Sequence, residues 1–250
     1  MKQFAAISLI ALSVVASAAA QIRAPQLGFA GAADGTLRPV YGVAGNFILG
    51  SPVRGQVISE AFSGSLGLLK TDSTLAAFDG QGKVLATTDA AAGPALFAFS
   101  VDGVTALAYV GSSNTLIEWR AGRFEAVPFH SGPDPILAIA LSTGEASLIV
   151  QRPDGLWEVG SVSQKALVGV TAPVLALASG ELVSSDAGGI ALRKLDGTEV
   201  HIAGHLPAKF SLQQMDREWV QLSDLGTARR FAIRVASGRE ALYQLPEAGQ

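Results

Sequence analysis

The chain of 250 residues has no cysteine, few charged side chains and only one long apolar run. Without cysteine it forms no disulfide, carries no lipid-modified thiol and offers no thiolate to a metal ion. Charged residues make up 16%, below the roughly 25% of average domains. The net charge of −3 is not gathered into a basic stripe, which argues against a nucleic-acid partner.

The one apolar run covers residues 4–15 and is followed by small residues. This order is typical of a secretory signal peptide over residues 1–20, cleaved after Ala20 or Ala18. The alternative is a membrane anchor, which would need roughly 20 apolar residues. No later segment is long and apolar enough to span a bilayer, so we expect residues 21–250 to form a single periplasmic or secreted domain.

Short apolar runs recur along this domain, and each follows a loop that contains Pro or Gly. Their first residues are 39, 40, 38 and 36 positions apart: VISEAF from Val57, LFAFSV from Leu96, ILAIAL from Ile136, VLALAS from Val174 and FSLQQM from Phe210. A small turn, a second short strand and a hairpin come after each run. Four short strands in a period of this length are the pattern of a β-propeller blade.

The repeat resembles bacterial β-propeller repeat families that are loosely related to WD-repeat and Kelch-type propellers. The resemblance runs from Leu27 to Leu245 and is one of architecture. The Gly-His and Trp-Asp pairs of WD repeats do not recur, and the three tryptophans are not followed by Asp. It therefore implies a fold and leaves the function open. A pair of β-sandwiches, the alternative all-β architecture, would not need so regular a period.

The blade count depends on the N-terminal stretch, residues 27–43. It matches only the second half of a repeat unit and predicts one hairpin across Asp34 and Gly35, followed by a short extended segment. Added to five full units, it predicts an all-β ring of four-stranded blades with six blades, of which the sixth is thin or completed by irregular strands. The alternative is five blades with an N-terminal cap.

Standard catalytic motifs are absent: there is no Walker-type loop, no G-x-S-x-G, no H-E-x-x-H and no EF-hand loop. The recurring Asp-Gly pairs predict hairpin turns rather than calcium ligands, because both residues tolerate positive φ. His201 and His205 are four residues apart, but we place them in an outer strand and the following loop, where they do not form a metal pair. Trp119, Trp157 and Trp219 are expected in the core. We expect no cofactor, no metal and no catalytic residue.

Binding residues are sought at one end of the ring. In a propeller, the loops between second and third strands share an end with the loops between blades, and we call this end the loop face. Loops on a rigid scaffold are where binding residues concentrate. The candidate ligand-binding residues on these loops are His130, Asp134, Arg152, His205 and Asp224.

Two classes of function fit these features. The first is an exported, non-enzymatic binding or scaffold module for a protein, peptide or glycan partner, with no membrane span in the mature chain. The alternative is a metal-dependent propeller enzyme of the lactone hydrolase or lyase type. Resemblance to those enzymes implies a divalent cation held by Glu, Asn and Asp side chains in the central funnel, and Glu60 is the clearest acidic residue on the inner strands.

Overall fold

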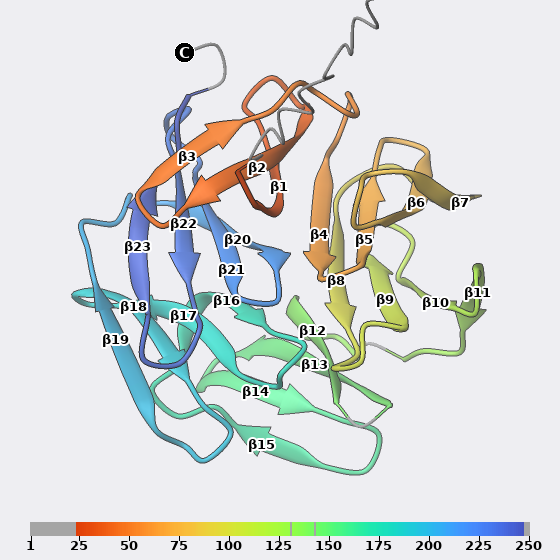
Figure 1. Ribbon diagram of the computed structural model, residues 1–250. Coiled ribbons are helices and arrows are strands. Elements are labelled where there is room, and N and C mark those ends of the chain that lie inside the picture. The colour runs from red at the N-terminus through yellow and green to blue at the C-terminus, as the bar shows by residue number, and fades with distance from the viewer. Residues whose placement is uncertain (1–23, 131, 143, 248–250) are drawn as a thin grey trace, which may run out of the picture.

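In the computed structural model the chain is a six-bladed β-propeller, described over residues 24–130, 132–142 and 144–247 (Figure 1). These residues form strands and turns and contain no helix. Five blades have four antiparallel strands and the N-terminal blade has three. The predicted all-β ring of six blades, with one thin blade, is confirmed. The predicted signal peptide lies outside the described residues.

Each blade is one continuous segment of the chain, and its strands pair in sequence order. Blade I contains β1 (Gln26–Gly31), β2 (Leu37–Val43) and β3 (Asn46–Leu49). Blade II contains β4 (Ser59–Ser63), β5 (Leu66–Lys70), β6 (Thr74–Asp79) and β7 (Val84–Asp89). Blade III contains β8 (Ala95–Phe99), β9 (Thr105–Val110), β10 (Thr115–Arg120) and β11 (Arg123–Val127).

The second half of the ring repeats this plan. Blade IV contains β12 (Ile136–Ser142), β13 (Glu145–Arg152), β14 (Gly155–Val159) and β15 (Gln164–Ala166). Blade V contains β16 (Thr171–Ala176), β17 (Leu182–Asp186), β18 (Gly189–Arg193) and β19 (Glu199–Ala203). Blade VI contains β20 (Phe210–Asp216), β21 (Trp219–Asp224), β22 (Arg230–Arg234) and β23 (Ala241–Gln244).

The Asp-Gly pairs are turns, as predicted. The Asp34 and Asp196 carboxylates each accept a hydrogen bond of 2.9 Å from the backbone N–H two residues further on. Gly35 and Gly197 follow them with φ values of 71° and 85°, a region that side chains with a Cβ atom rarely adopt. These aspartates are therefore occupied in fixing backbone geometry.

The core consists of the interfaces between blades. Trp119 is only 5% exposed and packs against Phe124, with 4.9 Å between ring centroids, in a cluster that joins blades II and III. Trp219 is 4% exposed at the interface of blades VI and I. The prediction of core tryptophans is confirmed for these two, whereas Trp157 is half-buried beside the Arg152 guanidinium.

The first strand of blade I runs in the opposite direction to the inner strands of its neighbours. Gly31 at the end of β1 lies against Glu60 near the start of β4, and Gly28 near the start of β1 lies against Met215 near the end of β20. The strand β1 thus runs antiparallel to both neighbouring inner strands, as the second strand of a blade would. The thin blade lacks its inner strand, and the predicted hairpin across Asp34 turns at the loop face.

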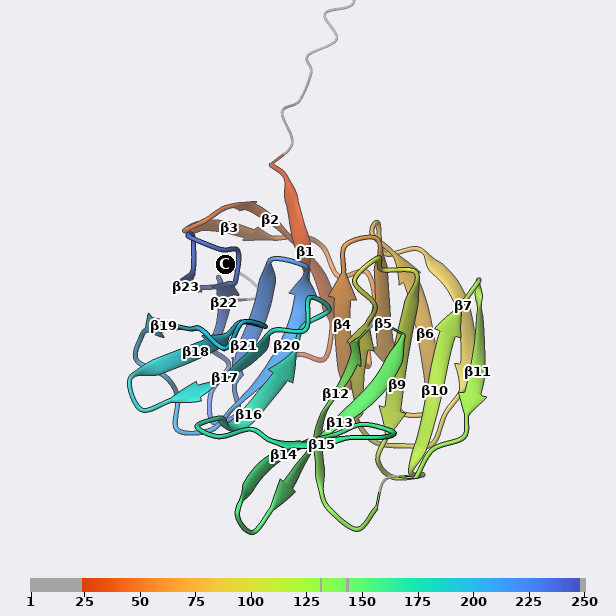
Figure 2. The ribbon, with the colours of Figure 1, turned by 90° about the horizontal axis from the view of Figure 1, so that it is seen from below.

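Six blades therefore surround a channel lined by five inner strands. β20 packs directly against β4, and β1 contacts both of them (Figures 1 and 2). The free edge of β1 is closed by a side chain: the Gln221 amide donates to the Gly31 carbonyl (3.2 Å) and accepts from the Gly31 N–H (3.1 Å). Among the described residues, no strand from one end of the chain joins the sheet of the other.

Candidate functional site

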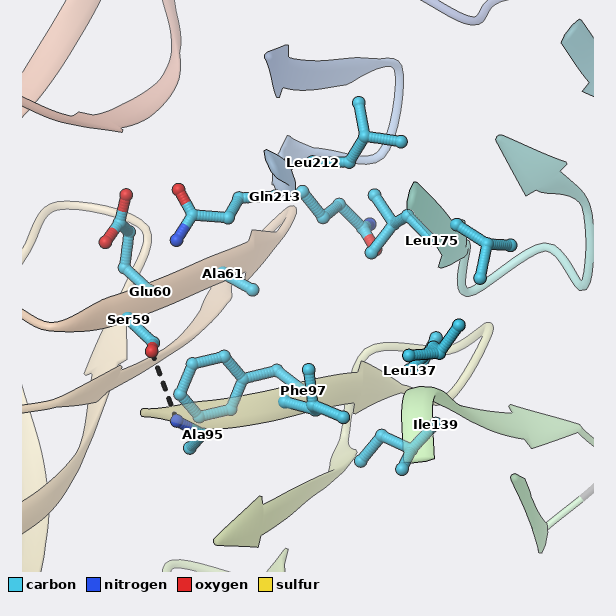
Figure 3. Close-up of a pocket in the computed structure, with 14 residues that line it drawn as sticks. Ser59, Glu60, Ala61, Ala95, Phe97, Leu137, Ile139, Leu175, Leu212 and Gln213 are labelled. Atoms are coloured by element: carbon cyan, nitrogen blue, oxygen red, sulfur yellow. Dashed lines mark hydrogen bonds between the residues drawn. The ribbon is translucent and has the colours of Figure 1, made fainter. Parts of the chain in front are cut away.

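The channel itself is narrow and mostly apolar, with a volume of about 60 Å³ (Figure 3). Its walls come from all five inner strands. The apolar side chains that line it include Phe97, Leu137, Ile139, Leu175 and Leu212. Ser59 is already occupied, because its hydroxyl accepts a hydrogen bond from the Ala95 N–H (3.1 Å). Such a space holds a few water molecules and no organic substrate.

Glu60 and Gln213 bring polar groups to one side of this channel, as Figure 3 shows. Glu60 is only 5% exposed. Burial raises the pKa of its carboxyl to about 7, while a backbone hydrogen bond from Gly31 and the positive charge of Arg230 oppose the rise. Gly31 has no side chain at the point of closest approach, where a Cβ atom would fall 2.2 Å from the carboxyl oxygen.

A wider hollow of about 660 Å³ opens at the mouth of the channel, and we call it the basin. It is bounded by the starts of the inner strands and by the loop that joins blades V and VI. Its apolar lining includes Leu96, Leu137, Leu206, Pro207 and Leu225. The side chain of Leu225 is 66% exposed. Asp186 and Lys209 supply the two charges at the rim.

Two of the predicted site residues form one cluster on blade IV. Arg152 Nε donates to the Asp134 carboxylate at 2.8 Å, and its guanidinium also bonds Gln164 (3.1 Å). The guanidinium carbon lies 4.9 Å from the centre of the Trp157 ring. This cluster joins the blade III–IV loop to the turn after β13. It places a cation–π pair, the Arg152 guanidinium over the Trp157 ring, on the loop face.

The other three predicted residues are separate from that cluster and from one another. Asp224 accepts hydrogen bonds from Thr227 (2.6 Å) and from the backbone N–H of Gly226 (2.8 Å), which lower the pKa of its carboxyl. It therefore shapes its own loop beside the basin. His205 is exposed in the loop that borders the basin. His130 lines a different groove, between the outer strands of blades III and IV.

Three polar residues near Glu60 were not among the predicted ones: Gln213, Gln221 and Arg230. They line a second, polar hollow beside the basin. A sequence signal did exist, because the inner run of blade VI reads FSLQQM where the other inner runs are largely apolar. Two adjacent glutamines in a strand next to the channel have no reason to be there for packing alone.

The described ranges contain no helix able to cross a membrane. Within the same ranges, no three His, Asp or Glu side chains gather closely enough to hold a metal ion. His201, four residues before His205, forms a hydrogen bond with Asp186 through Nδ1 at 2.7 Å.

Comparison with known proteins identifies the fold alone. No family model matches the chain, and no curated protein matches its sequence. Among solved structures, the chain is similar to one from a nidogen/laminin complex, with 12% identity over 88% of this chain and 98% of the other and a TM-score of 0.55. A protein of unknown function from Bacteroides caccae has 13% identity over 88% and 98%, with a TM-score of 0.50.

TolB from Acinetobacter baumannii is also similar, with 13% identity and a TM-score of 0.52. The match covers 85% of this chain and 63% of TolB, so the chain corresponds to part of that protein's length. These solved neighbours are β-propeller proteins, and at such low identity they support the fold and nothing beyond it.

Proposed function

We propose that this protein is an exported binding module and that a protein or peptide partner docks on the loop face over the basin. The basin carries the proposal. It is a concave, largely apolar surface of about 660 Å³, within the size range of ligand pockets, and it has few polar groups to fix orientation. The basin lies on the ends of paired strands, which hold its lining residues in place.

Among the apolar residues of the basin, Leu225 is exposed, whereas Leu206 is half-buried against the core of blades V and VI. Leu225 is 66% exposed in a turn, where burial contributes little to stability. Leu206 and Pro207 border the same hollow from the blade V–VI loop. Binding interfaces centre on an aromatic or aliphatic anchor in a pocket with a polar rim, and Lys209 and Asp186 stand at the rim.

A peptide partner fits this lining better than a glycan does. Sugar recognition relies on an aromatic stacking platform and on several side-chain hydrogen bonds, whereas the basin offers Phe210 near the channel wall and mostly aliphatic side chains elsewhere. The metal-dependent alternative would use Glu60, which is alone among the described acidic residues in the channel lining. Export is proposed from the signal-like segment 1–20, and an intact mass of the periplasmic product lacking these residues would support it.

The experiment uses aspartate substitutions at opposite ends of the ring. Leu225→Asp and Ala208→Asp place charge at exposed positions in the basin, while Val104→Asp and Leu195→Asp change exposed apolar residues in turns at the other end. A partner captured from envelope extract is identified, purified and titrated against each variant. We expect the basin variants to weaken binding by about 2 kcal/mol or more and the controls to bind as the wild type does.

A second series tests the residues predicted from the sequence. Alanine at His130, Arg152 and Asp224 is compared with alanine at Lys83 and Arg123, which lie toward the opposite end. If only the Lys83 and Arg123 variants lose binding, the partner docks at the opposite end of the ring and the proposal is wrong. A captured glycan in place of a protein would contradict the peptide assignment while keeping the loop face.

A further inference from the structure

A polar hollow of about 160 Å³ lies beside the basin where blades VI, I and II meet and blade I contributes no inner strand. Its walls are the inner half of blade VI, the start of β4 and the β1–β2 turn. It opens at the loop face and shares Ser211 with the basin and Glu60 and Gln213 with the channel. It has room for several water molecules, or for one small polar molecule.

The polar lining is specific to this interface. Gln213, Gln221 and Ala232 stand in one cross-strand row of blade VI. The row at the same position of blade V is Leu175, Val183 and Leu192, and all three pack into the apolar interface with blade VI. Burying amides is costly unless they are hydrogen-bonded. Gln221 is used to close the edge of β1, but the side chain of Gln213 makes no hydrogen bond within the described residues.

Two ionisable groups of opposite sign face the hollow without forming an ion pair. Glu60 is 95% buried, being 5% exposed, and Arg230 lies across from it on β22. They form no ion pair with each other, although each influences the titration of the other. Arg230 Nε is buried without a hydrogen-bond partner. Its Nη1 donates to the Ala228 carbonyl (3.2 Å). A guanidinium has five N–H donors, so an acceptor placed between the two groups would add charge-assisted hydrogen bonds that Arg230 lacks.

We propose that this hollow binds a small zwitterion, of the class of a free α-amino acid, with its ammonium group on Glu60 and its carboxylate on Arg230. The amide of Gln213 and the hydroxyl of Ser211 remain free to bond the ligand. Both charges of the ligand are then paired, as burial requires. The volume admits an amino acid with a short side chain, such as alanine or serine.

The titration of the two groups agrees with this assignment. Burial raises the pKa of Glu60 to about 7 and lowers the pKa of Arg230. The charged groups that act on them are each other and Asp34, which faces Arg230 from the β1–β2 turn. An ammonium group beside Glu60 favours its ionised form. Binding near pH 6.5 therefore releases protons to the buffer.

The test is isothermal titration calorimetry of the purified protein with L-alanine and L-serine. Propionate lacks the ammonium group, L-alaninamide lacks the carboxylate, and glucose represents a neutral polyol. We expect the two amino acids to bind and each single-charge analogue to bind at least tenfold more weakly. At pH 6.5 the binding enthalpy should differ between phosphate and imidazole buffers by an amount that corresponds to proton release.

Glu60→Gln and Arg230→Gln should each weaken L-alanine binding at least tenfold, and Glu60→Gln should also abolish proton release. Glu145→Gln and Arg120→Gln change exposed residues and should leave both L-alanine binding and proton release unchanged. If Arg230→Gln does not fold, Gln213→Leu is the substitute. Binding of glucose without the amino acids, or no binding of either, overturns the proposal. Leu225→Asp separates this site from the basin, because it should leave amino-acid binding intact.

Discussion

Replacing Glu60 by glutamine should make the protein more stable at alkaline pH and leave its stability unchanged in acid. The carboxyl has a pKa of about 7 in the folded protein against an ordinary 4.5. In the unfolded chain it ionises above 4.5, while the folded protein holds its proton up to about 7. The folded state thus keeps its full stability below pH 4.5 and loses stability as the pH rises through 7.

The gap between the two pKa values corresponds to about 3 kcal/mol. Glutamine has nearly the same shape and no charge, so Glu60→Gln removes this loss. We expect the variant and the wild type to differ little at pH 4.5, and the variant to be more stable by about 3 kcal/mol at pH 8. Because Gly31 fits closely against the side chain, an isosteric change is needed rather than alanine.

The assay is urea unfolding followed by tryptophan fluorescence at pH 4.5, 6 and 8, since Trp119 and Trp219 are buried. Glu145→Gln, at an exposed position, controls for the general effect of removing one acidic residue. The quantity of interest is the change with pH of the stability difference between variant and wild type. A difference that is the same at pH 4.5 and pH 8 would show that Glu60 is not held protonated by burial, and the reasoning fails.

Three further predictions concern packing and ring closure. Trp119→Ala should destabilise by about 3–5 kcal/mol in urea unfolding, because a buried aromatic leaves a cavity; a loss under about 1 kcal/mol would mean that this side chain is exposed. Gly28→Ala should lower the melting temperature far more than Gly55→Ala, since a Cβ atom would lie 2.2 Å from a main-chain carbonyl in the first case and meet nothing in the second. Gln221→Leu should speed hydrogen exchange at the Gly31 amide by removing its partner; unchanged exchange would contradict a role in closing the edge of β1.

The repeat could be predicted from the sequence because each blade buries both faces, and its inner strand therefore consists of a short apolar run. Leu96 and Ile136 begin two such runs and stand at or beside the start of β8 and β12. The Asp-Gly turns were also predictable, since their residues are chosen for backbone geometry. These features are local, and local features are what a sequence pattern records.

The missing inner strand of blade I, and with it the direction of β1, could not be predicted in the same way. A hairpin across Asp34 looks alike whichever strand of a blade it follows, and only its contacts with Glu60 and Met215 reveal the direction of β1. The site residues depend on the same long-range contacts. Gln221 and Arg230 come from strands about 160 or more residues away from Glu60 in the chain, and no spacing rule links them.

Each blade is one continuous segment of the chain, and within the described ranges no strand from one terminus completes the sheet of the other. The blades can therefore fold one by one, but the ring can close only when the last blade is present. Each blade can form from its own stretch of chain, as local contacts fold fastest. The contact between Gly31 and Gln221 spans 190 residues, so it costs roughly 2–3 kcal/mol more chain entropy than closing a ten-residue hairpin. Blade I therefore cannot be closed into the ring until blade VI, the last to be formed along the chain, is in place. Until then the apolar face of blade I and the open edge of β1 are unprotected.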